Sequence, residues 1–269
     1  MLSADRLQAL DAFLVELNRA SAETILPLFR VENSLEDKGG PDFFDPVTAA
    51  DKGAEAAIRG RISQHFPEHG VIGEEYGEDR PDAEFVWVLD PIDGTRAFIA
   101  GLPVWTTLIG LRFQGRPVLG SIGQPYMGEL YIGHAGGSRL ISRGSSSPLR
   151  VRQGVGLNQG IIATTDPHGC FDGSEMGAWR QVRAASRLAR TGCDAYAYAM
   201  VANGTIDLVV EAGLKSWDIE AAIPVLEGAG GLVTDWRGDP VGNHGGQVAI
   251  AGDRALLDEA LVALRRAAK

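Results

Sequence analysis

The sequence predicts a mixed protein whose first half is α+β and whose second half is layered α/β. In the first half, apolar residues at helical three- and four-residue steps precede several strand-like runs, and in the second half strand-like and helix-like segments alternate. The Ser-rich stretch SRGSSSPLR, residues 142–150, is the best candidate boundary between them. We therefore expect an N-terminal half at residues 1–145 and a C-terminal half at residues 146–269.

The N-terminal half is expected to begin with two helices and to continue as a sheet. Apolar residues recur with helical spacing from Leu7 to Leu28, and Pro27 marks the end of this helix. Thr48 can cap a second helix, which Pro67 ends. Strand-like runs joined by Gly-containing turns follow at residues 71–72, 85–89, 106–113, 117–122 and 129–132.

The C-terminal half is expected to alternate between strands and helices, as in a layered α/β unit. Strands are expected at residues 161–165, 206–211, 231–235 and 248–251, and helices at residues 176–188, 195–202, 218–228 and 253–268.

Composition and charge restrict the classes of partner. The chain has 269 residues, 45% of them hydrophobic, and 35 acidic against 25 basic residues give a formal net charge of -10. A broad basic surface that could follow a nucleic-acid backbone is therefore not expected. An acidic protein that handles a phosphorylated small molecule must neutralise the phosphate locally, with a bound metal or with backbone amides at a helix start.

The sequence predicts a cytoplasmic protein. Cys170 and Cys193 do not form a CxxC pair and indicate neither a disulfide framework nor a zinc site. The N-terminus lacks a basic segment followed by an apolar core, and no run of 18 apolar residues occurs. We predict neither export nor membrane insertion.

The segment VWVLDPIDGTRAF, residues 86–98, carries the strongest chemical signal. A strand of buried type ends in Asp90, turns through Pro91 and reaches Asp93 before a helix begins. The free N–H groups at the helix start can bind an anion, and two carboxylates on one turn can hold a metal in front of it. Because the cluster lacks histidine and cysteine, it favours Mg²⁺ over zinc. The alternative is an ordinary turn in which Asp93 caps the helix.

Three further acidic segments are each ambiguous when taken alone. In VIGEEYG a short apolar strand ends at Glu74, which is either a metal ligand or part of a solvated turn. In DPVTAAD, Thr48 and Asp51 have the spacing of a capping box. In KSWDIEAA, Asp218 stands at a helix start, where a carboxylate can also be a cap.

Taken together and in this order, DPVTAAD, GEE, WVLDPIDGT and WDIEAA followed by EGAGG resemble the signature segments of the inositol monophosphatase superfamily. The resemblance runs from about residue 45 to residue 235. It implies a layered αβαβα sandwich, usually a homodimer, and a Mg²⁺-dependent phosphomonoesterase with two or three metal ions.

The resemblance also implies a set of metal ligands. Glu74, Asp90 and the carbonyl of Ile92 would hold one Mg²⁺, while Asp90, Asp93 and Asp218 would hold a second. Mg²⁺ on both sides of an in-line displacement activates a water and stabilises the leaving alkoxide.

The same resemblance assigns the catalytic and phosphate-binding groups. Thr95, with Asp51 and the metal ligand Glu74, would serve the attacking water, and the amides of Gly94 and Thr95 would bind phosphate oxygens. Family members often place a lysine ahead of the DxVTxxD segment, but here the spacer KGGPDFFD is lengthened, so the role of Lys38 stays open.

The segment RTGCDAYAY bears on the choice of substrate, because RxGxDxYAY resembles the histidinol-phosphate phosphatases of the superfamily. Asp194 and Glu211 beside a metal-bound phosphate would form an anionic end suited to an ammonium group, which histidinol phosphate carries. The alternative for Asp194 is a cap on the helix that begins in AYAYAM. The expected substrate-binding residues are Asp93, Arg190, Gly192, Asp194 and Glu211.

Other functions remain open at this point. The first is an inositol-1-phosphate or related polyol phosphatase, in which Asp194 is a cap. The second is a non-catalytic phosphate-binding regulator. The third is a phosphatase for 3′-phosphonucleotides or fructose bisphosphate, against which the acidic pocket argues. We expect surface positions for the histidines at 65, 69, 134, 168 and 244.

Overall fold

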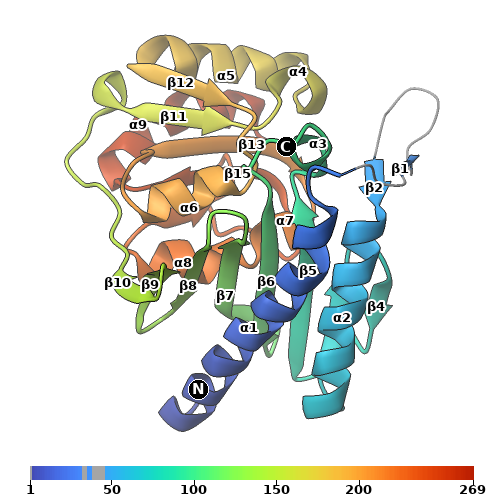
Figure 1. The fold of residues 1–269 in the computed structure, drawn as a ribbon. Helices are drawn as coiled ribbons and strands as arrows, with labels where there is room; N and C mark the ends of the chain where they lie inside the picture. Colours follow the sequence, from blue (N-terminus) through green and yellow to red (C-terminus); the bar gives the residue numbers. More distant parts are fainter. Residues whose placement is uncertain (1, 32–34, 38–45) are drawn as a thin grey trace.

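The described chain forms a layered αβαβα sandwich, as expected (Figure 1). The computed structural model describes residues 2–31, 35–37 and 46–269, so Lys38 lies outside the described residues. Two helices cover an eight-stranded sheet, two more lie between this sheet and a five-stranded sheet, and two cover the outer face of the second sheet.

The first helical layer consists of α1 (Ala4–Ile25) and α2 (Ala49–His65). Leu14 of α1 and Ile58 of α2 are fully buried in one cluster with Trp87 of the eight-stranded sheet. This apolar face forms at helical spacing, which is why the two helices could be predicted from the sequence. The short 3-10 helix η1 (Leu26–Leu28) follows α1.

The eight-stranded sheet has the order β10-β9-β8-β7-β6-β5-β3-β4. Its β3 and β5 pair in parallel, and the other neighbours are antiparallel. A separate two-stranded pair joins β1 (Leu35–Asp37) and β2 (Pro46–Thr48). The strands of the large sheet are β3 (Gly70–Gly73), β4 (Gly77–Asp79), β5 (Phe85–Asp93), β6 (Thr106–Phe113), β7 (Arg116–Gln124), β8 (Glu129–His134), β9 (Gly137–Ser142) and β10 (Ser145–Pro148).

The Ser-rich segment that we considered a boundary contains a strand. Residues Ser145–Pro148 form β10, which pairs with β9 at the edge of the eight-stranded sheet. These residues are exposed, so their strand has no apolar alternation that a sequence pattern could detect. The division into halves at residues 145 and 146 stays a prediction.

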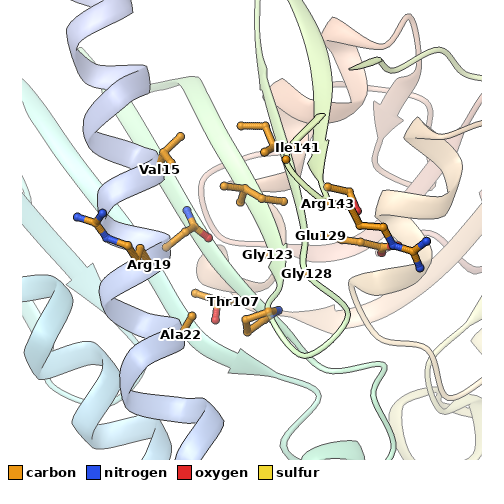
Figure 2. A pocket seen from close by; sticks show the side chains of 14 residues that line it. Val15, Arg19, Ala22, Thr107, Gly123, Gly128, Glu129, Ile141 and Arg143 are labelled. Carbon is orange, nitrogen blue, oxygen red and sulfur yellow. The ribbon is translucent and has the colours of Figure 1, made fainter. Parts of the chain in front are cut away.

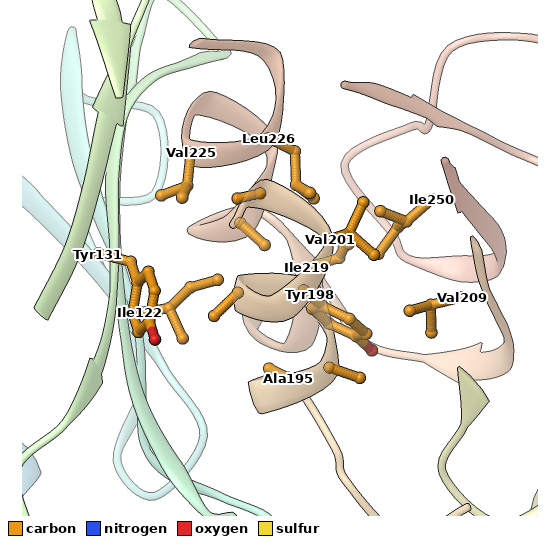
Figure 3. Packing of buried hydrophobic residues seen from close by; sticks show 14 of the residues in the cluster. Ile122, Tyr131, Ala195, Tyr198, Val201, Val209, Ile219, Val225, Leu226 and Ile250 are labelled. Carbon is orange, nitrogen blue, oxygen red and sulfur yellow. The ribbon is translucent and has the colours of Figure 1, made fainter. Parts of the chain in front are cut away.

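The middle helical layer fills the space between the two sheets. Tyr131 of the eight-stranded sheet, Tyr198 of α6 and Val209 of the five-stranded sheet are buried in one cluster, and Figure 3 shows Tyr198 between the other two. The layer consists of α6 (Tyr196–Ala202) and α8 (Ala222–Gly228).

The five-stranded sheet has the order β12-β11-β13-β15-β14 and is buried on both faces. Within β13, Val209 packs in the inter-sheet cluster, whereas Leu208 and Val210 pack against the outer helices, as the two-residue period of a strand requires. The remaining elements are η2 (Leu157–Gln159), β11 (Ile161–Thr164), α4 (Pro167–Cys170), α5 (Gly173–Ala185), β12 (Leu188–Thr191), β13 (Leu208–Leu214), α7 (Ser216–Ile219), β14 (Leu232–Thr234), β15 (Gly246–Ala251), α9 (Arg254–Leu264) and η3 (Arg265–Ala267).

The expected surface position is wrong for His69, which is fully buried. Its ring stacks between Phe66 and Phe85 with centroids 4.5 and 4.7 Å away, and Trp87 Nε1 donates to its Nδ1 at 3.1 Å. Burial lowers the pKa of His69 to about 4. A neutral imidazole in this stack serves the core of the first half.

A cavity of about 290 Å³ lies between α1 and the neighbouring strands (Figure 2). Val15, Thr107 and Ile141 line it, and Thr107 also donates to the carbonyl of Pro91 at 2.8 Å. A residue of its wall therefore contacts the stretch between the two aspartates of β5.

Within the described residues, no helix has the length and apolar character needed to cross a membrane.

Candidate active site

Strand β5 carries Asp90 and Asp93 to one edge of the site. Asp90 pairs with Leu108 of β6 and Asp93 pairs with Thr106, with a shift of register between the two pairs. Pro91 lies in this irregular stretch, where it cannot donate a hydrogen bond to the ladder. The local distortion allows two carboxylates from one strand to serve the same site.

Three carboxylates meet there. Oxygen atoms of Asp90, Asp93 and Asp218 all lie within 4.8 Å of one another. Asp218 comes from α7 and also accepts a hydrogen bond from the backbone N–H of Lys215 at 2.7 Å. The capping and the metal-binding interpretations of Asp218 are thus compatible, because its two oxygens can serve different partners.

The electrostatics of this cluster suit a divalent cation. Burial raises the pKa of Asp90 well above its usual value, and the charges of Glu74, Asp93, Asp218 and Asp51 raise it further. Asp90 Oδ1 is buried and accepts no hydrogen bond from any residue that the structure describes. An all-oxygen donor set with crowded negative charge fits Mg²⁺ better than zinc.

Glu74 and Asp51 lie close enough to Asp90 for their charges to act on it. The backbone N–H of Glu74 donates to Leu89 at 3.3 Å, which fixes Glu74 beside β5. Asp51 accepts hydrogen bonds from the N–H and hydroxyl of Thr48 at 2.8 and 2.6 Å. The predicted capping box at the start of α2 is confirmed.

Gly94 and Thr95 open the short helix α3 (Thr95–Ile99) directly after Asp93. Gly94 has a φ of 84°, a left-handed conformation that favours glycine. The hydroxyl of Thr95 donates to the carbonyl of Ile92 at 3.1 Å. Thr95 therefore contacts the same carbonyl that the resemblance assigns to a metal.

Asp194 packs directly against this turn, although it lies 100 residues further along the chain. A Cβ added to Gly94 would lie 3.0 Å from both Cγ and Oδ2 of Asp194. Helix α6 has no side-chain cap, so the capping alternative for Asp194 is wrong. Asp194 has a φ of 45°, an unfavourable conformation that residues at functional sites often adopt. Burial raises its pKa to about 6, and the charge of Arg96 opposes this rise.

Glu211 lies behind Asp194 on β13 and is buried. It accepts hydrogen bonds from the N–H and hydroxyl of Thr165 at 2.9 Å each, and from the hydroxyl of Thr164 at 3.4 Å. Burial raises the pKa of Glu211 to about 8; the hydrogen bonds lower it and the charge of Asp194 raises it. The charge of Asp194 thus acts on Glu211.

Gly192 and Arg190 occupy different surroundings. Gly192 has a φ of 78° and donates its N–H to the carbonyl of Thr165 at 2.8 Å, so it borders the Glu211 site. Arg190 is exposed on β12, and its charge opposes the rise that burial causes in the pKa of Cys193. The structure gives Arg190 no contact with the acidic cluster among the described residues, and its role stays a prediction.

Several site residues had no local signal in the sequence. Thr106 donates to Asp93 Oδ2 at 3.4 Å, and the backbone N–H of Ala195 donates to the same oxygen at 2.7 Å. Arg96 pairs with Asp166 at 3.3 Å. These contacts join segments that are distant in the sequence, so spacing could not predict them.

Comparisons with known proteins agree with this geometry. The model of the inositol monophosphatase family matches residues 6–269. The chain is 43% identical over 221 residues to the bifunctional phosphatase IMPL2, chloroplastic, of Arabidopsis thaliana, covering 81% of this chain and 62% of that protein. It is 36% identical over 193 residues to a histidinol-phosphatase of Chlorobaculum parvum, covering 72% and 73% of the two chains.

Solved structures show the same fold. The structure of an inositol monophosphatase from Zymomonas mobilis has a TM-score of 0.86 and 38% identity, and covers 98% of this chain and 100% of its own. The family hydrolyses phosphate monoesters, is metal-dependent and typically uses Mg²⁺. Since the family model covers nearly the whole chain, the chain belongs to the inositol monophosphatase family.

Proposed function

We propose that this phosphatase hydrolyses L-histidinol phosphate to L-histidinol and phosphate. The observation that carries the proposal is the carboxylate of Asp194, which lies against Gly94 at the turn of the acidic cluster. If the phosphate group of the substrate binds at that turn, the alcohol part of the ester lies beside Asp194. An ammonium group on this part would then contact the Asp194 carboxylate.

The surroundings of Asp194 support recognition of a cation. Its pKa is raised because burial leaves the carboxylate poorly solvated and because the charge of Asp166 acts on it. A bound ammonium group would compensate these charges and would make a charge-assisted hydrogen bond. A neutral polyol has no such charge, so the pair favours the amine-bearing substrate.

The metal and catalytic assignments form the second part of the proposal. Mg²⁺, when bound, supplies a water of lowered pKa and stabilises the leaving oxygen. The hydroxyl of Thr95 and the carboxylate of Asp51, with Glu74, orient that water, and the amides of Gly94 and Thr95 hold phosphate oxygens. The residues that would hold two or three Mg²⁺ ions are Glu74, Asp90, Ile92 through its carbonyl, Asp93 and Asp218.

Inositol-1-phosphate is the second candidate substrate. The 38% identity to a solved inositol monophosphatase favours this substrate. The metal cluster does not distinguish the two candidates, because it would serve either ester. Phosphate release from the two esters, with and without Mg²⁺, distinguishes the candidates on one purified sample. We expect metal-dependent turnover with a preference for histidinol phosphate. A preference for inositol-1-phosphate would refute the substrate proposal and leave the metal assignment intact.

We also propose a homodimer that acts in the cytoplasm. Exposed apolar side chains gather around η1, α3 and the β7–β8 turn, where Arg30 joins the parts by hydrogen bonds to Gly101 and Tyr126. Such a patch suits burial against a second copy, which light scattering on the purified protein can test. The patch consists of Leu26, Val31, Ile99, Leu102 and Tyr126.

The cytoplasmic part of the proposal rests on the cysteines. Both cysteines are free thiols, as suits a reducing compartment.

A further inference from the structure

We infer that Glu55, together with Arg59, is a positioning residue that holds Glu74 in the geometry needed for Mg²⁺ binding. Both residues lie on α2 and neither belongs to the acidic cluster. The inference rests on the proposed role of Glu74 as a metal ligand and adds to it the residues that fix the backbone carrying Glu74.

Glu55 is a fully buried carboxylate that binds backbone rather than solvent. Its Oε2 accepts the N–H of Glu75 at 2.8 Å, and its Oε1 accepts the N–H of Tyr76 at 3.2 Å. These are the two N–H groups directly after Glu74. A carboxylate that binds two successive amides fixes the path of the chain through them.

The position of the Glu55 carboxylate also explains why the residue before Glu74 is a glycine. A Cβ added to Gly73 would lie 2.1 Å from Glu55 Oε1, and both atoms could not occupy that space. Glycine at position 73 therefore allows the carboxylate to reach the turn. Gly73 pairs with Gly77 where β3 and β4 meet, so Glu55 lies beneath a tight turn with Glu74 in it.

Arg59 completes the arrangement from the next turn of α2. Its Nε lies 2.7 Å from Glu55 Oε1, and its Nη2 donates to the carbonyl of Gly77 at the far end of the turn. The guanidinium neutralises the buried charge of Glu55 and binds the end of the turn that Glu55 does not reach.

Helix α2 thereby positions two parts of the cluster from one face. Asp51 and Glu55 are four residues apart, so their side chains project from the same side of the helix. The charge of Asp51 acts on Asp90, while Glu55 holds the turn whose Glu74 acts on Asp90 more strongly. If Glu55 served stability alone, its carboxylate would not need to bind the backbone directly after the proposed metal ligand Glu74.

The test is Mg²⁺ binding measured by calorimetry without substrate, on wild type, Glu55→Gln and Glu175→Gln. Glu175 is the matched control, because it is also buried, accepts a backbone N–H at 2.7 Å and pairs with Lys269 at 2.9 Å, but lies in the outer layer on α5. We expect Glu55→Gln to weaken Mg²⁺ binding by about 10- to 100-fold. High Mg²⁺ should restore most of its turnover, and Glu175→Gln should lower Tm without changing Mg²⁺ affinity.

Two further variants keep the inference testable. Arg59→Gln, at a side chain that is 19% exposed, should weaken Mg²⁺ binding in the same direction and serves if Glu55→Gln does not fold. Unchanged Mg²⁺ affinity in the folded Glu55 or Arg59 variants would overturn the positioning role, provided that Glu74→Gln loses affinity. If wild type binds no Mg²⁺, or Glu74→Gln binds it normally, the proposed metal role of Glu74 fails instead.

Discussion

The two ends of the site share one arrangement, because each places a carboxylate with an open oxygen beside a carboxylate that already accepts hydrogen bonds. At the metal end, which β5 and α7 carry, Asp90 has an oxygen without a hydrogen bond from any described residue. At the other end Glu211 already accepts three hydrogen bonds, whereas no described residue donates one to the carboxylate of Asp194. Open carboxylate oxygens thus lie at Asp90 and Asp194, and those are the positions where we expect a cation to bind.

Asp90→Asn should have the largest effect on catalysis, because Asp90 is the proposed ligand of two metal ions. We expect turnover to fall on the order of a thousandfold or more. Without Mg²⁺, however, the variant should unfold at the same or a higher temperature than wild type, since one buried negative charge is removed from a repulsive cluster. Steady-state kinetics and thermal unfolding with EDTA check both parts. Full activity would refute the role of Asp90 as a metal ligand, and a strongly lowered Tm would show that Asp90 stabilises the fold.

Asp194→Asn should change substrate preference more than catalysis. Loss of a partly buried charge pair costs about 2–5 kcal/mol, so the preference for histidinol phosphate over inositol-1-phosphate should fall by about 30-fold or more. Most of the change should appear in KM, because the metal cluster is intact. Equal losses on the two substrates would return Asp194 to a role in shaping the turn.

Acid should weaken the first half of the molecule through His69. Its folded pKa of about 4 lies below the usual 6.5, so the unfolded chain binds more protons between these values. The stabilisation is complete above about pH 6.5 and is lost as the pH falls toward 4, with a loss of about 2 kcal/mol at pH 5 and about 3 kcal/mol near pH 4. Urea unfolding of wild type and His69→Gln at pH 7.5 and 5 measures this difference. A pH dependence that is identical in both proteins would exclude His69 as its source.

Glu211→Gln should have the smallest effect. The amide keeps one oxygen for Thr165, but its NH2 group faces the hydroxyl of Thr164, which donates to the carboxyl group in the wild type. We expect the substrate preference to fall by about fivefold, corresponding to about 1 kcal/mol. An effect larger than that of Asp194→Asn would move the main contact with the amine from Asp194 to Glu211.

Local patterns in the sequence pointed to two of the three carboxylates that the structure brings together. Asp90 and Asp93 stand on one strand end, and the Thr48–Asp51 capping box has a fixed spacing that the structure confirms. Only the resemblance grouped Asp218 with Asp90 and Asp93, because an aspartate at a helix start is explained equally well as a cap. The exposed hairpin of β9 and β10 has too few apolar residues for its strands to be predicted.

Contacts between distant segments could not be predicted from spacing. The packing of Asp194 against Gly94 depends on how α6 docks on the eight-stranded sheet. Glu55 looks like an ordinary polar position of a helix, and its partners lie about 20 residues away in a turn. No local pattern predicts the burial of His69, whose ring is stacked between Phe66, which directly follows α2, and Phe85 of β5.

The recognition of the amine by Asp194 is best measured with histidinol phosphate and an analogue that lacks its amino group. Wild type and Asp194→Asn are assayed with both esters at saturating Mg²⁺. We expect removal of the amino group to lower kcat/KM of wild type by about 30-fold or more and that of the variant only slightly, because the two changes remove the same contact. If wild type and variant lose the same factor, Asp194 does not bind the amine and the proposed substrate assignment loses its basis.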